Sequence, residues 1–177
     1  AFGENYLQEA LEKITALKEL EIEWHFIGHV QRNKTKALAE NFAWVHGVDR
    51  LIIAEHLSTQ RGDDQPALNI CIQVNIDGQD TKDGCQPEEV AELVAQISQL
   101  PNVRLRGLMV IPAPNNPQAF ADAKVLFDAV KVQHAHPEDW DTLSMGMSAD
   151  MTEAIAAGST MVRVGTALFG ARPKKDV

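Results

Sequence analysis

The chain has 177 residues, enough for one domain with a substantial core, and 45% of them are hydrophobic, as in ordinary globular proteins. No apolar run approaches the roughly 20 residues of a membrane helix, no secretory signal begins the chain, and its two cysteines lack metal or redox spacing. The net charge of −9 argues against a general nucleic-acid binder, which needs clustered basic surface. We therefore expect a cytoplasmic protein that contacts neither nucleic acid nor membrane.

Strand and helix patterns alternate along the chain. Strands are expected at 1–3, 24–28, 44–48, 68–76, 103–111, 142–145 and 160–164, and helices at 4–20, 31–42, 50–61, 87–100, 118–134 and 148–157. Asp49 and Ser148 stand where side chains commonly cap a helix, and Pro87 stands at a first helical position.

This alternation with short connections predicts one domain of parallel strands with helices packed outside. Both an open doubly wound sheet and a (β/α)₈ barrel fit the pattern, although no G-x-G-x-x-G fingerprint follows any strand. Six whole strands and the end of a seventh are too few for a closed eight-stranded barrel. We therefore expect the beginning of the natural domain to be missing from this sequence.

In parallel α/β folds the functional site lies at the C-terminal ends of the strands. The residues expected there are Gly3, Glu4, Asn5, His25, Gly28, Asn75, Met109, Pro112, Ser144, Gly146, Met147, Ser148, Arg163, Gly165 and Thr166. The last two strands end in turns that contain glycine and hydroxyl side chains, and barrels often bind phosphate after their last two strands. The segment from Ser144 to Gly170 is therefore predicted to form a phosphate-binding cup.

Several of these side chains also have plain structural explanations. Arg163 is either a salt-bridged structural residue or a cation that faces a phosphate or a ring nitrogen of the ligand. His25 is more typical of a hydrogen-bonded core histidine than of a catalytic one, and Asn75 could close a turn or donate to a ligand oxygen. His46 shows no spacing that would make a metal site.

The motifs as a whole resemble the pyridoxal phosphate homeostasis proteins of the YggS/PROSC type. The resemblance is carried by Phe2-Gly3-Glu4-Asn5-Tyr6, Trp24-His25-Phe26-Ile27-Gly28, Gln31 with Asn33-Lys34, Arg106-Gly107-Leu108-Met109, Ile111-Pro112, Ser144-Met145-Gly146-Met147-Ser148 and residues 158–166. These motifs occur in the family's order and cover nearly the whole chain.

The resemblance implies an alanine-racemase-like (β/α)₈ TIM-type barrel, incomplete at its N-terminus, with 1–177 as a single domain that binds pyridoxal 5′-phosphate (PLP). It implies a non-catalytic PLP carrier and regulator of vitamin B6 and amino-acid balance, with PLP-dependent apo-enzymes as possible partners and a monomeric complete protein. By residue, Ser144, Ser148, Gly165 and Thr166 match the phosphate-binding turns, Arg163 matches an arginine beside the cofactor, and Asn5, His25, Asn75 and Met109 match positions around the ring.

One departure from the family pattern concerns the lysine that binds PLP covalently. In the family this lysine precedes the Phe-Gly-Glu-Asn motif at which this sequence begins. Lys34 and Lys36 do not replace it by motif. We therefore expect the sequence to contain the phosphate cup but not the covalent attachment point, and to leave strand edges exposed.

Two enzyme functions compete with the carrier. A PLP-dependent racemase on the same barrel needs a second acid–base group, typically a tyrosine from another domain, and Tyr6 is the only tyrosine. A sugar phosphate isomerase needs a carboxylate base at a strand end, where this chain has Glu4. Both are less compatible with the sequence than the carrier.

Overall fold

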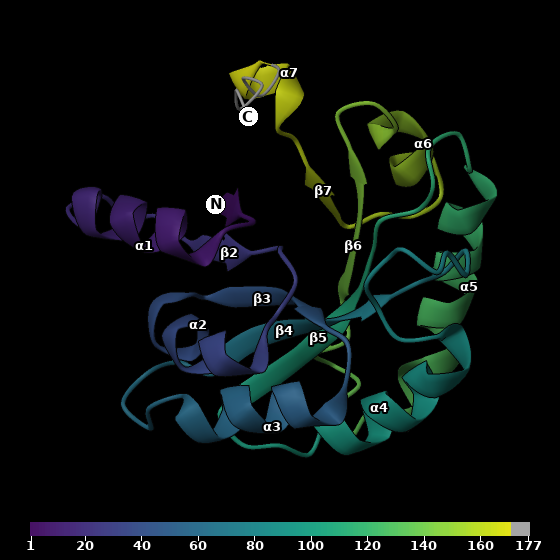
Figure 1. Ribbon diagram of the computed structural model, residues 1–177. Helices are drawn as coiled ribbons and strands as arrows, with labels where there is room; N and C mark the ends of the chain where they lie inside the picture. The colour runs from purple at the N-terminus through teal and green to yellow at the C-terminus, as the bar shows by residue number, and fades with distance from the viewer. Residues whose placement is uncertain (171–177) are drawn as a thin grey trace.

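The computed structural model describes residues 1–170 and shows seven parallel strands that alternate with helices (Figure 1). The strands are β1 (Phe2–Glu4), β2 (Trp24–Phe26), β3 (Trp44–Val48), β4 (Leu68–Val74), β5 (Val103–Val110), β6 (Thr142–Met147) and β7 (Met161–Arg163). The α-helices are α1 (Leu7–Ala16), α2 (Thr35–Asn41), α3 (Leu51–Gln60), α4 (Val90–Ile97), α5 (Gln118–Val130), α6 (Met151–Ala156) and α7 (Thr166–Phe169). Short 3₁₀ helices extend α2, α4 and α5 at Arg32–Lys34, Pro87–Glu89 and Lys131–Gln133.

The strands lie side by side in the order in which they occur in the sequence, from β1 to β7. A doubly wound sheet would reverse its order part-way, so this topology is that of a barrel. Within residues 1–170, β1 and β7 do not pair with each other, so the barrel is incomplete and has two open edges. Figure 1 shows the helices around the outside of the curved sheet, with both ends of the described chain at the same side.

Two hydrophobic clusters cover the two faces of the sheet. The larger one lies between strands and helices, where Ile70 and Ile72 of β4 pack with Leu57, Val94 and other buried helix residues. The smaller one fills the barrel interior with Trp44, Cys71 and Met109, which belong to three neighbouring strands. Both faces of β4 are therefore buried, as expected for a parallel strand inside a helix-covered barrel.

The expected elements are all present, and their ends differ from the expectation in two informative places. The first helix begins at Leu7 instead of residue 4, because Glu4 pairs with Phe26 as part of β1. Asp49 does not cap α3, so that prediction is wrong. The helix begins one residue later, after Arg50, and the Asp49 carboxylate instead accepts a hydrogen bond from Arg50 Nε at 3.1 Å.

The helices of residues 1–170 are all too short or too polar to cross a membrane. In the same part of the chain, no three histidine, cysteine or carboxylate side chains gather in a way that could hold a metal ion.

Candidate functional site

The rim of the barrel after β6 and β7 is formed by two turns that approach each other. Gly146 adopts a φ of +93°, and a Cβ there would come within 2.5 Å of the Ala154 side chain, so this bend requires glycine. The bend brings the β6–α6 turn towards the turn after β7, where the Ala167 N–H donates to Ser148 Oγ at 3.3 Å. The two turns predicted to form one cup are therefore in direct contact.

Ser148 does not cap α6 as the sequence suggested. The helix begins after Asp150, whose carboxylate accepts the Met147 N–H at 2.7 Å, because the chain makes a further turn before it enters the helix. Ser148 lies within that turn, and its hydroxyl proton finds no acceptor within residues 1–170. A hydroxyl in this state can donate to an anion at the rim.

Gly165 and Thr166, which are predicted to form the other side of the cup, are exposed. Gly165 has a negative φ, and a Cβ there would meet no atom within 4 Å in the described part of the chain. Neither backbone conformation nor packing therefore requires glycine at this position. An open backbone at the rim is the arrangement that lets a ligand approach peptide N–H groups closely.

Arg163 ends β7 just below the cup and is partly buried. Its Nη1 donates to Ser144 Oγ at 2.7 Å and its Nη2 to the Val110 carbonyl at 3.0 Å. It forms no salt bridge with the residues that the structure describes, so the structural alternative of a salt-bridged arginine does not hold there. Burial lowers the pKa of Arg163 to about 10, and a desolvated cation of this kind favours an electron-rich partner.

Arg106, in contrast to Arg163, is paired with a carboxylate. Its guanidinium makes hydrogen bonds to both carboxylate oxygens of Asp141 and to Asn69 and lies 4.9 Å above the ring of Trp44. Hydrogen bonding to Asp141, together with its negative charge, raises the pKa of Arg106 despite burial, so its charge is neutralised within the fold. Of these two arginines, Arg163 has no carboxylate within salt-bridge distance among residues 1–170, and Asp150 acts on its charge only from farther away.

His46 is a candidate site residue that was not predicted from the sequence. It is fully buried in the barrel and lies within hydrogen-bond distance of both His25 and Ser144. The signal was present in the alternation of β3, where Trp44 and His46 share one face and Val45 lies on the other. Sequence spacing alone could not show that this face points into the barrel.

The remaining predicted residues lie at different depths. Met109 is fully buried beside Ser144, with which it is paired in the β5–β6 register, and so belongs to the barrel interior. The Asn75 side chain closes a turn by donating to the Gln79 carbonyl and accepting the Gln79 N–H. The Asn5 backbone packs against Gly28, where a Cβ would come within 2.2 Å of the Asn5 carbonyl oxygen. No hydrogen bond among residues 1–170 joins the Asn5 or Asn75 side chain to the cup.

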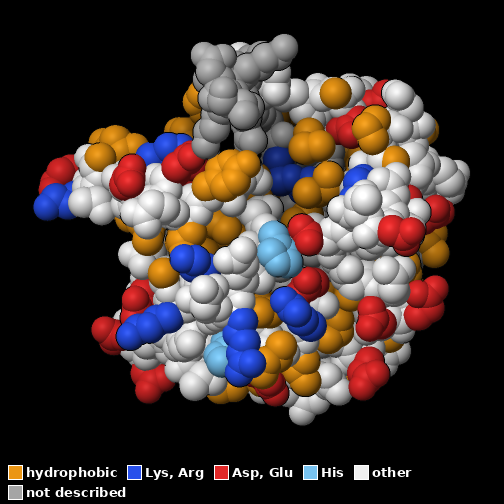
Figure 2. All heavy atoms as spheres, viewed as in Figure 1, with side chains coloured by type: hydrophobic (Ala, Val, Ile, Leu, Met, Phe, Trp, Pro, Cys, Tyr) orange, Lys and Arg blue, Asp and Glu red, His pale blue; other side chains and the backbone are white. Residues whose placement is uncertain are grey.

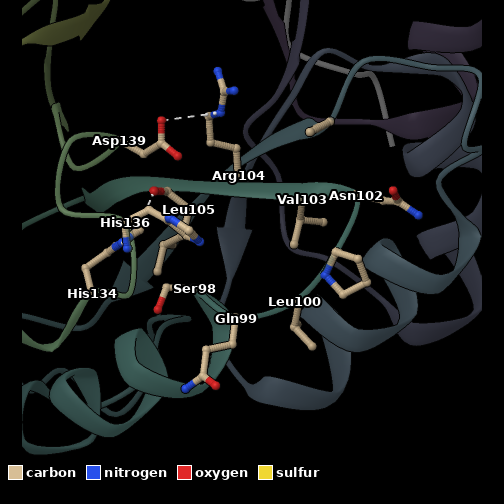
Figure 3. A pocket seen from close by; sticks show the side chains of 12 residues that line it. Ser98, Gln99, Leu100, Asn102, Val103, Arg104, Leu105, His134, His136 and Asp139 are labelled. Carbon is tan, nitrogen blue, oxygen red and sulfur yellow. Dashed lines mark hydrogen bonds and ion pairs between the residues drawn. The ribbon is translucent and has the colours of Figure 1, made fainter.

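The surface view shows hydrophobic side chains and a basic group close together between the N-terminus and β7 (Figure 2). Exposed hydrophobic residues near the two open edges include Phe2, Tyr6, Leu168 and Phe169, and Met147 of β6 is also exposed. A separate recess of about 380 Å³ lies at the other end of β5, near Asn102 and the Arg104–Asp139 ion pair (Figure 3). That recess is at the N-terminal ends of the strands and does not belong to the candidate site.

Comparison with known families gives a consistent result. The sequence pattern of the family described as "Alanine racemase, N-terminal domain" matches residues 1–173. The curated pyridoxal phosphate homeostasis protein of Pseudomonas aeruginosa is 52% identical over 176 residues, covering 97% of this chain and 74% of that protein. The protein of the same name from Escherichia coli K12 is 51% identical over 179 residues, covering 97% of this chain and 75% of that protein.

Solved structures agree with the sequence matches. PipY of Synechococcus elongatus without PLP superposes with a TM-score of 0.88 at 38% identity, covering 96% of this chain and 81% of that chain. The PLP-bound form of PipY has a TM-score of 0.84 at 37% identity, with the same coverage. Alanine racemase of Corynebacterium glutamicum has a TM-score of 0.70 at 15% identity, covering 100% of this chain and 49% of that chain, which shows a shared fold alone.

Proposed function

Because this chain belongs to the alanine racemase N-terminal domain family, and within it to the pyridoxal phosphate homeostasis proteins, we propose that it binds PLP and acts in vitamin B6 and amino-acid homeostasis. The observation that carries the proposal is the Arg163 guanidinium, which makes hydrogen bonds to neutral groups and no salt bridge within residues 1–170, beside a cup of unused donors. PipY, which shares this fold at 37% identity, has been solved with PLP bound.

The donor set fits the two ends of PLP. Ser148, Thr166 and the open backbone at Gly165 would hold the 5′-phosphate, since hydroxyl and peptide N–H groups are the usual ligands of a phosphate. Arg163, held by Ser144, would meet either the phosphate or the ring nitrogen, and Asn5, His25, Asn75 and Met109 would lie around the ring. When bound, PLP supplies an aldehyde that reacts with amines.

We propose that 1–177 forms one PLP-binding domain that carries the cofactor without turning over a substrate. The relatives are named homeostasis proteins and not enzymes. The racemase alternative needs a second acid–base group, but Tyr6 is exposed and Glu4 pairs with Lys13 at 2.7 Å. Lys34 and Lys36 are exposed on the helical segment outside the sheet. We propose further that the protein is cytoplasmic, that the complete protein is a monomer, and that it delivers PLP to apo-enzymes.

The test is equilibrium dialysis of the 177-residue chain against PLP, pyridoxine 5′-phosphate and pyridoxal. We expect retention of both phosphorylated compounds and much weaker retention of pyridoxal, because the cup binds the phosphate. Ser148→Ala should weaken PLP binding by roughly tenfold, the loss expected for one hydrogen bond to a charged group.

Thr59→Ala is the matched control, since the Thr59 hydroxyl bonds only the Glu55 carbonyl on an exposed face of α3. It should bind PLP like the unaltered chain. Equal retention of pyridoxal and PLP, or unchanged binding by Ser148→Ala, would remove the phosphate cup from the proposal.

A further inference from the structure

Five polar side chains form a continuous line of hydrogen bonds through the barrel. Glu23 Oε1 lies 3.0 Å from His25 Nε2, and His25 Nδ1 lies 2.9 Å from His46 Nε2. His46 Nδ1 lies 3.1 Å from Ser144 Oγ, which accepts from Arg163 Nη1 at 2.7 Å. His25, His46 and Ser144 are buried, so each polar atom in the middle of this line depends on its neighbours for a partner.

The line connects the two ends of the barrel. Glu23 precedes β2, at the N-terminal ends of the strands, and its side chain is 56% exposed. Arg163 is the last residue of β7, at the C-terminal ends where the cup lies. The His25 ring is also stacked on the Trp44 ring with 5.1 Å between centroids, which fixes its plane. A solvent-facing carboxylate is thereby joined to the base of the candidate site.

The chemistry of the two end groups determines the direction of every bond between them. A guanidinium can only donate and a carboxylate can only accept. Glu23 can only accept, so His25 donates to it from Nε2. A neutral His25 then accepts on Nδ1 from His46 Nε2, and a neutral His46 accepts on Nδ1 from the Ser144 hydroxyl, whose oxygen accepts from Arg163. With both rings neutral, each histidine has the single tautomer that is protonated on Nε2.

We infer that His25 and His46 are positioning residues of the site, because they hold Arg163 in place through Ser144. Glu23, at the opposite end of the barrel, sets the direction of the hydrogen bonds that connect them. The Val110 carbonyl fixes the second guanidinium nitrogen. The hydrogen bonds that orient Arg163 are thus made to neutral groups only, so its position is fixed without a salt bridge. The effect on PLP rests on the proposed function, whereas the bond direction does not.

The bond direction is tested on the unliganded chain by ¹⁵N NMR of its histidine rings at pH 7.5. We expect both His25 and His46 to show a protonated Nε2 and an unprotonated Nδ1. A His46 ring protonated on Nδ1, or rings that average between the two tautomers, would overturn the inference. Because no ligand is added, this result stands whether or not the chain binds PLP.

The positioning effect is tested by Glu23→Ala, with Glu21→Ala as the control. Glu21 is an exposed carboxylate two residues away that makes no hydrogen bond within residues 1–170. We expect Glu23→Ala to weaken PLP binding roughly two- to tenfold, as the loss of one hydrogen bond does, and to disturb the His46 ring signals. Glu23→Gln should restore both, because its amide oxygen accepts the same proton.

The two proposals fail differently. If the unaltered chain does not bind PLP, the proposed function fails and the ring tautomers still decide the bond direction. If the chain binds PLP but Glu23→Ala leaves both the affinity and the His46 signals unchanged, the positioning role is overturned and the proposed function remains.

Discussion

At the scale of single residues, three buried histidines make the stability depend on pH. Burial lowers the pKa of His25 and His134 and lowers that of His46 well below the usual 6.5. Above pH 6.5 both folded and unfolded chains hold these rings neutral. As the pH falls below 6.5, the unfolded chain takes up protons that the folded chain refuses, so stability falls, by at most about 1.4 kcal/mol per pH unit for each histidine.

Urea unfolding at pH 7.5, 6.5 and 5.5 measures this effect. Asp141 does not contribute to the change in stability between pH 7.5 and 5.5. Burial opposes its ionisation, but hydrogen bonds from Arg106 and Thr142 keep the pKa of its carboxyl below 3.8. His46→Gln should reduce the pH slope by the share of one histidine. Equal stability at pH 7.5 and 5.5 would show that the folded and unfolded chains take up the same number of protons, which would contradict the lowered pKa values of the buried histidines.

The residue scale is also where sequence reasoning was weakest. Arg163 and Ser144 were predicted as site residues, and the structure brings them together, but His46 was missed because its role depends on which face of β3 points inward. The caps at Asp49 and Ser148 were wrong because the helices begin later than predicted, after Arg50 and after Asp150. The two side chains instead accept hydrogen bonds from Arg50 Nε and from the Ala167 N–H.

At the scale of elements, the close approach of β5 to β6 explains why the Arg106-Gly107-Leu108-Met109 segment of β5 requires glycine at residue 107. It lies inside β5 with a φ of +154°, and a Cβ there would come within 1.7 Å of the Thr142 carbonyl oxygen on β6. Gly107→Ala must therefore push β5 and β6 apart, and we expect it to lower the free energy of unfolding by about 4 kcal/mol or more. Chemical denaturation followed by circular dichroism measures the change.

Gly78→Ala is the matched control for the backbone term. Gly78 also has a positive φ, of +63°, but a Cβ there would meet no atom within 4 Å. This change should lower stability by only about 1 kcal/mol, since it adds backbone strain without a collision. Similar losses for both variants would contradict the close approach of β5 to β6.

At the scale of the whole molecule, the order of elements was predictable from hydrophobic periodicity, because each strand and helix has its own pattern. The choice between an open sheet and a barrel was not, since both topologies bury the same alternating segments. That choice depends on how strands far apart in the chain pair, such as Met109 of β5 with Ser144 of β6. The family resemblance supplied what local patterns could not.

The incomplete barrel leads to a last prediction, about local stability. β4 and β5 are long, central and paired on both sides, whereas β1 and β7 have three residues each and one unpaired edge in the described chain. Local opening therefore exposes the edge strands without breaking the central core. In hydrogen exchange, we expect amides of β1 and β7 to exchange far faster than those of Ile72 or Leu108.

Unpaired strand edges can also pair with another copy, so the measurement is repeated on dilution. Protection of β1 and β7 equal to that of β4, and independent of concentration, would contradict the open edges; protection that is lost on dilution would show that a second copy covers them.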